Sequence, residues 1–435
     1  MKTIKLGQLW EESKVVSENP NSEKRIKVKL NVQGVEKRPD KNDQKGATKY
    51  FIRKVGQFIY GKQNLHKGAF GVIPKELDNF ESSSDIPAFD IIEECNPEWI
   101  YYYFKQGDFY KDLEMYSKGT GSKRIHPHKI SHLEILFPDR KEQERIIEKI
   151  KSHELNHSKL DNEINYQSKL LSSLRQSILS EAVQGKLVSQ NKEDESAFEL
   201  LKKIKKEKEK LIKEGKIKKG KELPAISDDE IPYELPKGWV WCRLGNLVSI
   251  LGDGIHGTPN YTNNGECFFV NGNNLDNGKI TIKENTKRVS EEECEKYKKK
   301  LNDRTILVSI NGTLGNVAFY NNEKIMLGKS ACYFNLLNDI NKDYIKLIIE
   351  TNYFLDYCFR NATGSTIKNV SLNSMRLFPI PLPPLPEQRQ IVEKVDVLMS
   401  FCDELELRVK ENKVNSEGLM SGVLREAFSE GFENE

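Results

Sequence analysis

Two stretches decide the fold of this chain: Glu142-Gln143-Glu144-Arg145-Ile146-Ile147-Glu148-Lys149 and, 245 residues later, Glu387-Gln388-Arg389-Gln390-Ile391-Val392-Glu393-Lys394. The same offset continues without a gap through Leu160 and Leu405 to Glu181-Ala182 and Glu426-Ala427, with ten identical pairs over the 41 residues from Glu142 to Ala182. One offset held over such a length indicates an internal duplication, and a missed repeat would misassign the whole fold.

Apolar side chains recur in both copies at alternating steps of four and three residues, which is the period of a coiled-coil seam. Proline is absent after the first few residues of each copy, so each copy is expected to form one long helix. Two apolar stripes in one chain are most simply buried against each other. The predicted seam consists of Ile146, Ile150, Leu160, Ile164, Leu171, Leu174, Ile178, Ile391, Val395, Leu398, Leu405, Val409, Leu419 and Val423.

A globular region precedes each predicted helix. Lys5-Leu6-Gly7-Gln8-Leu9 is similar to Arg243-Leu244-Gly245-Asn246-Leu247, and a short strand-like stretch stands before each helix, at 133–137 and 377–382. We therefore expect an α+β fold with a pseudo-two-fold repeat, in which two α/β domains are separated by two long helices packed as an antiparallel coiled coil. The predicted segments are 1–138 (first domain), 139–186 (first helix), 187–235 (lysine-rich helical extension and linker), 236–382 (second domain) and 383–435 (second helix).

The net charge of +3 is divided unevenly along the chain. Each globular region, 1–138 and 236–382, carries +4, whereas 383–435 carries −6. Moderately basic domains fit the binding of a polyanion. No apolar run approaches the ~20 residues of a membrane span, and Met1–Trp10 has no signal-peptide core, so a cytoplasmic protein without a membrane partner is expected.

Catalytic and metal-binding motifs are not found. The seven cysteines stand singly, which is typical of ordinary thiols rather than of a disulfide framework or a zinc site. Asn96-Pro97-Glu98-Trp99 is similar to the Asn-Pro-Pro-aromatic loop of amino-methyltransferases, but Glu98 replaces a proline and no cofactor loop accompanies it. A turn before a strand over 99–104 is expected there. His153 and His157 lack a third ligand, so they are expected to lie at the seam without a metal.

Glycine-rich loops are the candidate binding sites, because loops on a rigid scaffold carry most binding residues. Gly252–Pro259 contains three glycines and a proline, and its Asp253 and His256 are more simply explained by recognition than by catalysis. Gly312–Asn316 indicates a hairpin or bulge between strand-like runs at 305–310 and 317–320.

The pattern as a whole resembles the specificity subunit of type I restriction–modification systems. The residues that carry the resemblance are Leu382–Val392, its degenerate partner Phe137–Ile147, Ser177–Leu187, Leu235-Pro236-Lys237-Gly238-Trp239 and Thr363-Gly364-Ser365. The first domain departs from the family pattern, because it lacks a Pro-x-x-Trp start and has Asp139-Arg140-Lys141 in place of a proline-rich helix start.

The resemblance implies a non-catalytic, DNA-binding subunit whose two target-recognition domains each read one half of a split, asymmetric site in double-stranded DNA. The helices would set the gap and dock two methyltransferase subunits, and a restriction (translocase and nuclease) subunit would complete the assembly. S-adenosylmethionine, ATP and Mg²⁺ would bind those partners and not this chain. Two alternatives stay open: the specificity subunit of a related type II (IIB- or IIG-like) restriction–modification assembly, and a coiled-coil adaptor that binds no DNA.

Lysine and arginine would contact phosphates, while loop side chains read base edges. The candidate DNA-binding residues are two Thr-Gly-Ser loops with adjoining cations, and the loop that holds Asp253: Thr120, Gly121, Ser122, Lys123, Arg124, Asp253, His256, Thr363, Gly364, Ser365 and Lys368.

Overall fold

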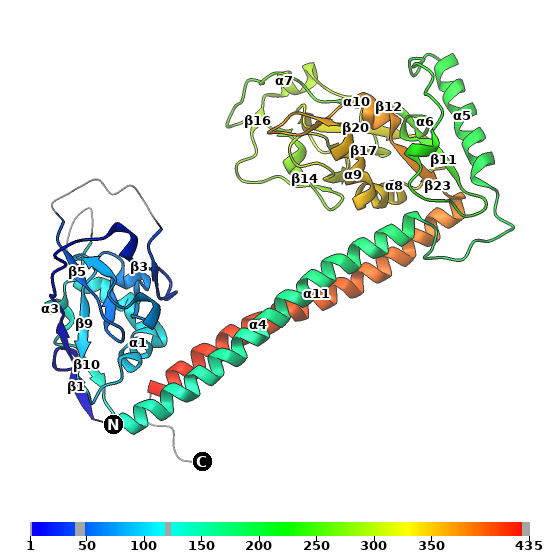
Figure 1. Cartoon of the computed structure of the whole chain (residues 1–435). Helices are drawn as coiled ribbons and strands as arrows, with labels where there is room; N and C mark the ends of the chain where they lie inside the picture. Colours follow the sequence, from blue (N-terminus) through cyan, green and yellow to red (C-terminus); the bar gives the residue numbers. More distant parts are fainter. Residues whose placement is uncertain (1, 40–47, 118–122, 429–435) are drawn as a thin grey trace. The chain divides into compact units, whose positions relative to one another are not determined.

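The computed structural model describes residues 2–39, 48–117 and 123–428 (Figure 1). The chain divides into two compact units, one of Met1–Gln167 with Arg408–Glu435 and the other of Ser168–Leu407. Each unit holds one globular domain and a part of both long helices. Among the described residues, no helix combines the length and the apolar character that crossing a bilayer requires.

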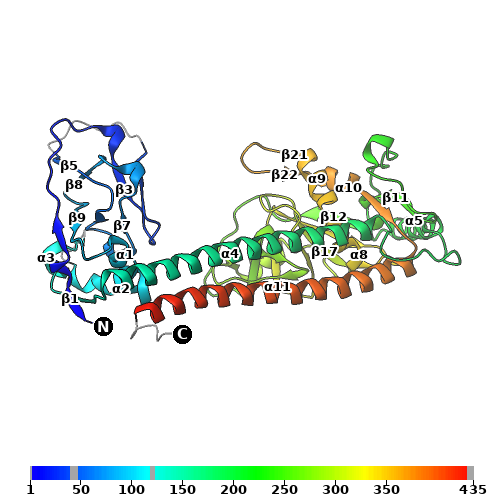
Figure 2. The same ribbon diagram turned by 60° about the horizontal axis from the view of Figure 1, so that its bottom comes forward.

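The two long helices are α4 (Arg140–Val183) and α11 (Leu385–Phe428), each of 44 residues. They lie side by side and antiparallel within each unit (Figures 1 and 2). In the second unit Arg175 of α4 donates hydrogen bonds to Asp403 and Glu406 of α11. In the first unit the Ser416 hydroxyl of α11 lies 3.4 Å from the Asp161 carboxylate of α4.

The buried stripe of this helix pair is only partly the predicted one. Ile146, Ile150, Ile164, Leu171, Ile178, Ile391 and Val395 are buried, and Leu398, Val409 and Val423 are partly buried. However, four predicted seam leucines are exposed, with 42% of Leu160, 45% of Leu174, 47% of Leu405 and 65% of Leu419 accessible.

At each of these four places, the residue that is turned inward is the one that follows the leucine in the sequence. Asp161, Arg175, Glu406 and Met420 are partly buried, and the first three make hydrogen bonds between the helices. Long polar side chains can cover apolar surface with their stems while their heads stay in water. The 3.5-residue period is the same for both stripes, so periodicity alone could not distinguish them.

The globular part of the first unit is a set of short strands around an aromatic core. Trp10 stacks on Phe89 with ring centroids 4.3 Å apart, and Phe58, Phe70 and Phe104 pack around them. Its elements are β1 (Thr3–Lys5), β2 (Trp10–Glu12), β3 (Ile26–Val28), β4 (Val35–Lys37), β5 (Tyr50–Ile52), β6 (Phe58–Tyr60), β7 (Phe70–Val72), β8 (Glu81–Ser83), β9 (Ala88–Ile91), α1 (Pro97–Lys105), α2 (Phe109–Asp112), α3 (Pro127–Ile130) and β10 (Glu134–Leu136).

The strand expected over 99–104 is wrong, because these residues form helix α1. The Asn96 side chain accepts a hydrogen bond from the Glu98 N–H as an N-cap, and Pro97 fits the first helical position. The run that suggested a strand has Trp99, Tyr102 and Phe104 buried in the core of the domain. Tertiary packing therefore outweighs its strand propensity.

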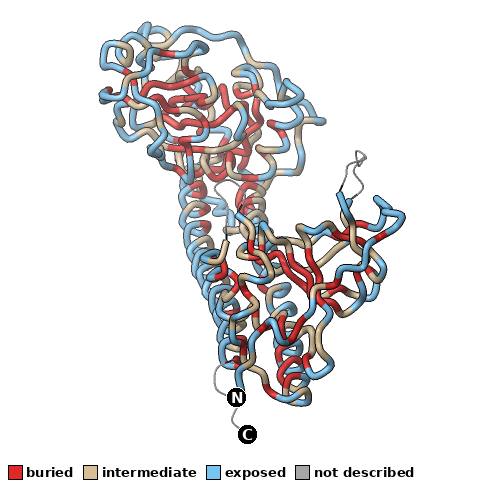
Figure 3. The backbone as a smooth tube through the Cα atoms, turned by 90° about the vertical axis from the view of Figure 1, so that its left-hand side faces the viewer, coloured by how far each residue is buried: buried red, intermediate tan, exposed pale blue. Residues whose placement is uncertain are grey.

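The second globular part is built on a four-stranded antiparallel sheet in the order β12-β20-β17-β18, with a second sheet in the order β16-β13-β19. Buried residues concentrate in these sheets and the helices on them (Figure 3). The strands are β11 (Val240–Arg243), β12 (Val248–Asp253), β13 (Cys267–Val270), β14 (Leu275–Asp276), β15 (Lys279–Ile280), β16 (Arg288–Val289), β17 (Thr305–Ser309), β18 (Val317–Phe319), β19 (Ile325–Leu327), β20 (Ala331–Leu336), β21 (Ala362–Thr363), β22 (Asn369–Val370) and β23 (Pro379–Leu382). The helices are α5 (Ala197–Lys213), α6 (Leu244–Leu247), α7 (Glu291–Lys296), α8 (Lys342–Ile349), α9 (Asn352–Asn361) and α10 (Leu372–Leu377).

The two globular parts share a layout around their first and last strands. β1 pairs with β10 in the first, and β11 pairs with β23 in the second, both antiparallel. The Leu6 N–H donates to the Leu133 carbonyl, and the Leu244 N–H donates to the Phe378 carbonyl, both at 2.8 Å. The repeat therefore extends beyond the long helices into both domains.

The segment 187–235 packs on the second globular part. Helix α5 buries Ala197, Leu200 and Ile204 in its core. The buried Arg243 guanidinium donates to the carbonyl oxygens of Pro224 and Ala225 and to both carboxylate oxygens of Glu230. The lysine-rich extension and the linker are thus held by direct contacts.

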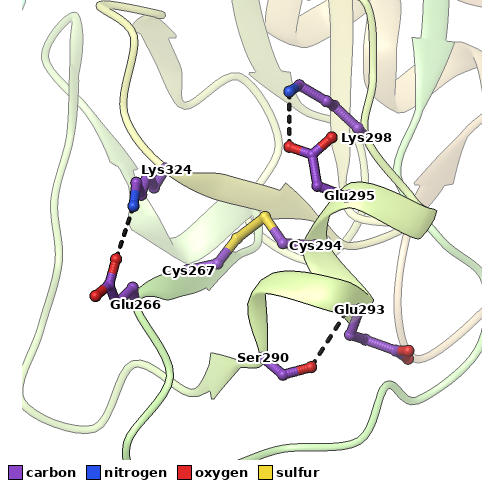
Figure 4. The surroundings of a disulfide bond; sticks show 8 residues. All are labelled: Glu266, Cys267, Ser290, Glu293, Cys294, Glu295, Lys298 and Lys324. Atoms are coloured by element: carbon purple, nitrogen blue, oxygen red, sulfur yellow. Dashed lines mark hydrogen bonds and ion pairs between the residues drawn. A yellow bond between two sulfur atoms is a disulfide. The ribbon is translucent and has the colours of Figure 1, made fainter.

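The expectation that all cysteines are ordinary thiols is wrong for two of them. Cys267 of β13 and Cys294 of α7 form a disulfide (Figure 4). They stand 27 residues apart and meet only because α7 folds back onto the second sheet. Cys402 is buried, as expected for a small core residue.

Candidate nucleic-acid interface

Four loops of the second globular part are connected by hydrogen bonds and close contacts and are called the loop row here, and the first of them follows β12. At Gly254 the chain comes so close to β19 that an added Cβ would lie 2.0 Å from the Leu327 carbonyl oxygen. The next residue, Ile255, donates its N–H to that same oxygen at 2.8 Å. The glycine thus fixes the loop against the end of β19, and His256 and the two residues after it are exposed.

The second member of the row is the turn after β13. The Gly272 N–H donates to the Ser330 hydroxyl at 2.9 Å, and that hydroxyl donates to the Asn271 side chain at 3.0 Å. A Cβ on Gly272 would lie 2.0 Å from the Ser309 hydroxyl, so the turn also rests on the end of β17.

The third and fourth members are the β17–β18 loop and the β21–β22 hairpin. The Asn311 amide donates to the Asn369 side chain at 3.1 Å, and the Gly312 N–H donates to the Lys368 carbonyl. β17 and β18 pair as the sequence predicts. Residues 363–368 form the exposed tip of the hairpin. These contacts connect the loops at 253–256 and 363–368, which sequence reasoning had proposed separately.

The exposed side chains of this row are mostly polar. The His256 Nε2 lies 2.8 Å from the Asp253 carboxylate, and 73% of the histidine side chain is accessible. Thr363, Gly364, Ser365 and Lys368 are all exposed. Lys368 forms no ion pair with the residues that the structure describes, so its ammonium group is available to an anion.

In the first globular part the predicted cations have acidic partners. Lys123 lies 2.6 Å from Glu114, and this hydrogen bond lowers the pKa of the Glu114 carboxyl. Arg124 makes two hydrogen bonds of 3.2 Å to Asp85. Thr120, Gly121 and Ser122 lie outside the described residues.

Charge counting along the sequence missed that several arginines are buried. Arg53 is 1% exposed and donates to the Ser13 and Ile86 carbonyls, and burial lowers its pKa to about 10. Arg25 is also buried, against Glu81, and Arg243 is 4% exposed. These buried arginines count toward the net charge of their domains, but they contribute little positive charge to the surface.

A metal centre is not indicated by the described part of the chain, where no three His, Cys, Asp or Glu side chains gather. His153 is exposed, and His157 is half-buried with its Nδ1 3.2 Å from the Asp161 carboxylate.

Comparison with known proteins finds a family match in the second half of the chain. Residues 236–416, which include the whole loop row, match the family described as "Type I restriction modification DNA specificity domain". Residues 236–416 are thus similar to that specificity domain. The predicted resemblance to type I specificity subunits is therefore confirmed.

The chain is also similar in sequence to specificity subunits of type I restriction enzymes. The chain is 33% identical over 250 residues to the type I restriction enzyme EcoEI specificity subunit of Escherichia coli, and 32% identical over 251 residues to the EcoAI specificity subunit of the same species. Each match covers 55% of this chain and 42% of the relative, so the chain matches less than half of the length of these proteins.

Solved structures share the mixed helix and sheet fold over nearly the whole chain. The HsdS subunit from Thermoanaerobacter tengcongensis superposes with a TM-score of 0.54 at 16% identity, and covers 98% of this chain and 96% of its own. A chain from a study of complex assembly and conformational transition of the type I R-M system reaches 0.63, also at 16% identity, with 98% and 97% covered.

Proposed function

We propose that the chain is the DNA-reading specificity subunit of a type I restriction–modification complex. The observation that carries the proposal is the DNA specificity domain at 236–416. The shared layout of β1–β10 and β11–β23 supports a second recognition domain in the first half. The two proposed recognition domains are residues 1–138 and 236–382, each followed by one of the long helices.

Reading of the target falls to the loop row in the second domain. Lys368 is placed to contact a phosphate, whereas amide and hydroxyl side chains such as Asn273 and Thr313 are exposed and can bond base edges in a groove. Because the loops of the first domain are unrelated in sequence, the two halves of the target are expected to differ.

The outer face of the long helices is the proposed docking site for methyltransferase subunits. In the second unit, Leu170 and Leu174 lie one turn apart on α4, as do Phe401 and Leu405 on α11, and these four side chains are between 45% and 57% exposed. Large apolar side chains gathered at a surface commonly mark a protein interface. The chain itself is proposed to be non-catalytic, with S-adenosylmethionine, ATP and Mg²⁺ bound by the methyltransferase and restriction subunits.

A methylation map of the host genome, made with and without this chain, tests the proposal. We expect the loss of adenine methylation at one split motif with unequal halves. Exchange of residues 1–138 for another recognition domain should change one half and leave the other half and the gap intact. Unaltered methylation after deletion of the chain, or a change in both halves after the exchange, would contradict the proposal.

A further inference from the structure

Two buried glutamines stand at the same place in the first turn of the long helices. Gln143 is the fourth residue of α4 and Gln388 is the fourth residue of α11, and both are 0% exposed. A buried amide needs partners for its carbonyl oxygen and for its NH₂ group, because an unpaired buried polar group destabilises the fold.

Two partners of each glutamine correspond across the repeat, and the Gln143 NH₂ also donates to the Glu94 carbonyl at 3.1 Å. The Gln143 carbonyl accepts the Asn96 backbone N–H at 2.8 Å, and its NH₂ donates to the Pro138 carbonyl at 2.9 Å. The Gln388 carbonyl accepts the Asn341 backbone N–H at 2.9 Å, and its NH₂ donates to the Pro383 carbonyl at 3.0 Å. Each corresponding pair stands 245 residues apart.

The residue that each glutamine holds is itself an N-cap. Asn96 caps α1 and Asn341 caps α8 through their side chains. A second hydrogen bond joins each of these helices to the strand that precedes the long helix, α1 to β10 and α8 to β23. The Trp99 indole donates to the Leu136 carbonyl at 2.8 Å, and the Tyr344 hydroxyl donates to the Pro381 carbonyl at 2.7 Å. Trp99 and Tyr344 are again 245 residues apart, as are Leu136 and Pro381.

We propose that Gln143 and Gln388 are positioning residues that fix the orientation of each recognition domain on the long helix that follows it. A domain that rotated about the start of its helix would pull the cap N–H away from the glutamine carbonyl and leave both buried groups unpaired. The gap between the half-sites would then depend on these two side chains as well as on helix length. This last step rests on the proposed function.

The test uses full-length protein assembled with its methyltransferase subunits. Gln388→Met and Gln143→Met keep the side-chain volume and remove the hydrogen bonds, and Gln388→Ala is a second variant at the same site. Gln167→Met is the matched control, because Gln167 is exposed and donates to Glu163 of its own helix.

Hydrogen exchange gives a readout that does not depend on DNA. We expect about tenfold faster exchange at Asn341 in Gln388→Met, with Asn96 unchanged, and the reverse in Gln143→Met, since one lost hydrogen bond corresponds to roughly a factor of ten. Equal protection of Asn341 in wild type and Gln388→Met would overturn the proposal. Faster exchange throughout the domain would also overturn it, because that result indicates a general structural role.

Binding to duplexes with altered gaps gives the second readout. Wild type should lose about tenfold in affinity when the gap changes by one base pair, and both glutamine variants should lose about threefold or less, while substitutions within a half-site cost the same in all proteins. A folded Gln388→Met protein with wild-type gap preference would overturn the proposal. A wild-type protein that binds no split target contradicts the proposed function instead, and exchange at Asn341 then decides the role of Gln388.

Discussion

Arg175 of α4 donates a hydrogen bond of 2.6 Å to Asp403 of α11. The same guanidinium lies 3.1 Å from Glu406 and near the sulfur of Met399. Across the repeat, the residue that corresponds to Arg175 is Met420, which has no charge. This contact therefore has no symmetric counterpart, and it can distinguish one axial register of the two helices from others, as polar seam residues do in coiled coils.

The first prediction concerns the free energy of this contact. Arg175→Ala should lower the free energy of unfolding by about 1 kcal/mol, and Asp403→Ala by about 0.5 kcal/mol or less, because the Asp403 side chain is 72% exposed and water screens the pair. Urea unfolding of both variants and of the double variant measures the coupling. A coupling energy above about 2 kcal/mol would show that the pair is desolvated, contrary to the structure.

The second prediction separates the buried stripe from the exposed one. Leu171 is 8% exposed and Leu174 is 45% exposed, although both stand on α4 in the predicted seam. Leu171→Ala should cost about 2–3 kcal/mol of unfolding free energy, whereas Leu174→Ala should cost less than about 1 kcal/mol. An equal loss of unfolding free energy in the two variants, measured by chemical denaturation, would mean that both leucines are buried, as the predicted seam requires.

The exposed stripe gives a third prediction, which concerns partners. A Leu174→Ala, Leu405→Ala double variant should stay folded and weaken binding of the methyltransferase subunit by at least tenfold, because each loses apolar area that only a partner would bury. Titration calorimetry with purified subunits measures this. Lys169→Ala, at an exposed polar position of α4, is the control and should bind normally. Undiminished binding by the double variant would place the docking site elsewhere.

The fourth prediction is a pH dependence at the linker. The hydrogen bond from Arg243 lowers the pKa of Glu230 to about 2, against an ordinary value of 4.5. Because the folded-state pKa is the lower one, the stabilisation is complete above the ordinary pKa and is lost as the pH falls toward 2. Glu230→Gln should therefore be less stable than wild type at pH 7, and this difference should shrink below about pH 4.5.

Limited proteolysis at each pH measures how often the linker is released, because residues 223–236 expose their backbone to a protease only when the contact between Arg243 and Glu230 is broken. Glu266→Gln is the control, since Glu266 also pairs with a cation, Lys324, but both side chains are more than 60% exposed. A wild-type linker that is cleaved equally at pH 7 and pH 3 would contradict the prediction.

The sequence predicted the features that local pattern and repetition determine. The 245-residue offset predicted two long helices, which are α4 and α11, and the strand-like stretches at 133–137 and 377–382 became β10 and β23. The offset in fact continues to Asn96 and Asn341, but most side chains between differ, so the equivalence of α1 and α8 appears only in their hydrogen bonds.

Features that depend on tertiary contacts could not be predicted. Leu160 and Leu405 are identical across the repeat and fit the seam period, yet they face outward because neighbouring polar side chains reach the partner helix. The loops at 253–256 and 363–368 lie in one row only because Asn271 and Asn311 connect them to other strands. The sequence alone does not show which loops these hydrogen bonds bring together.

The last prediction concerns the Cys267–Cys294 disulfide. It closes a loop of 27 residues that contains β16 and most of α7. A crosslink of this length restricts the unfolded chain and is worth about 3.5 kcal/mol in the entropic model. Reduction should therefore lower the thermal stability of wild type. Cys267→Ser should have low stability with or without reductant, because the bond is already absent.

Two observations check this prediction together. Mass spectrometry after alkylation without reductant should find Cys267 and Cys294 blocked from reagent in the unfolded protein, whereas Cys95, Cys242, Cys332, Cys358 and Cys402 are modified, because the structure leaves these five as thiols. Cys358→Ser is the control and should respond to reductant as wild type does. Modification of all seven cysteines in unreduced, unfolded protein would show that the bond is absent, and the α7 segment would then be held to β13 by packing alone.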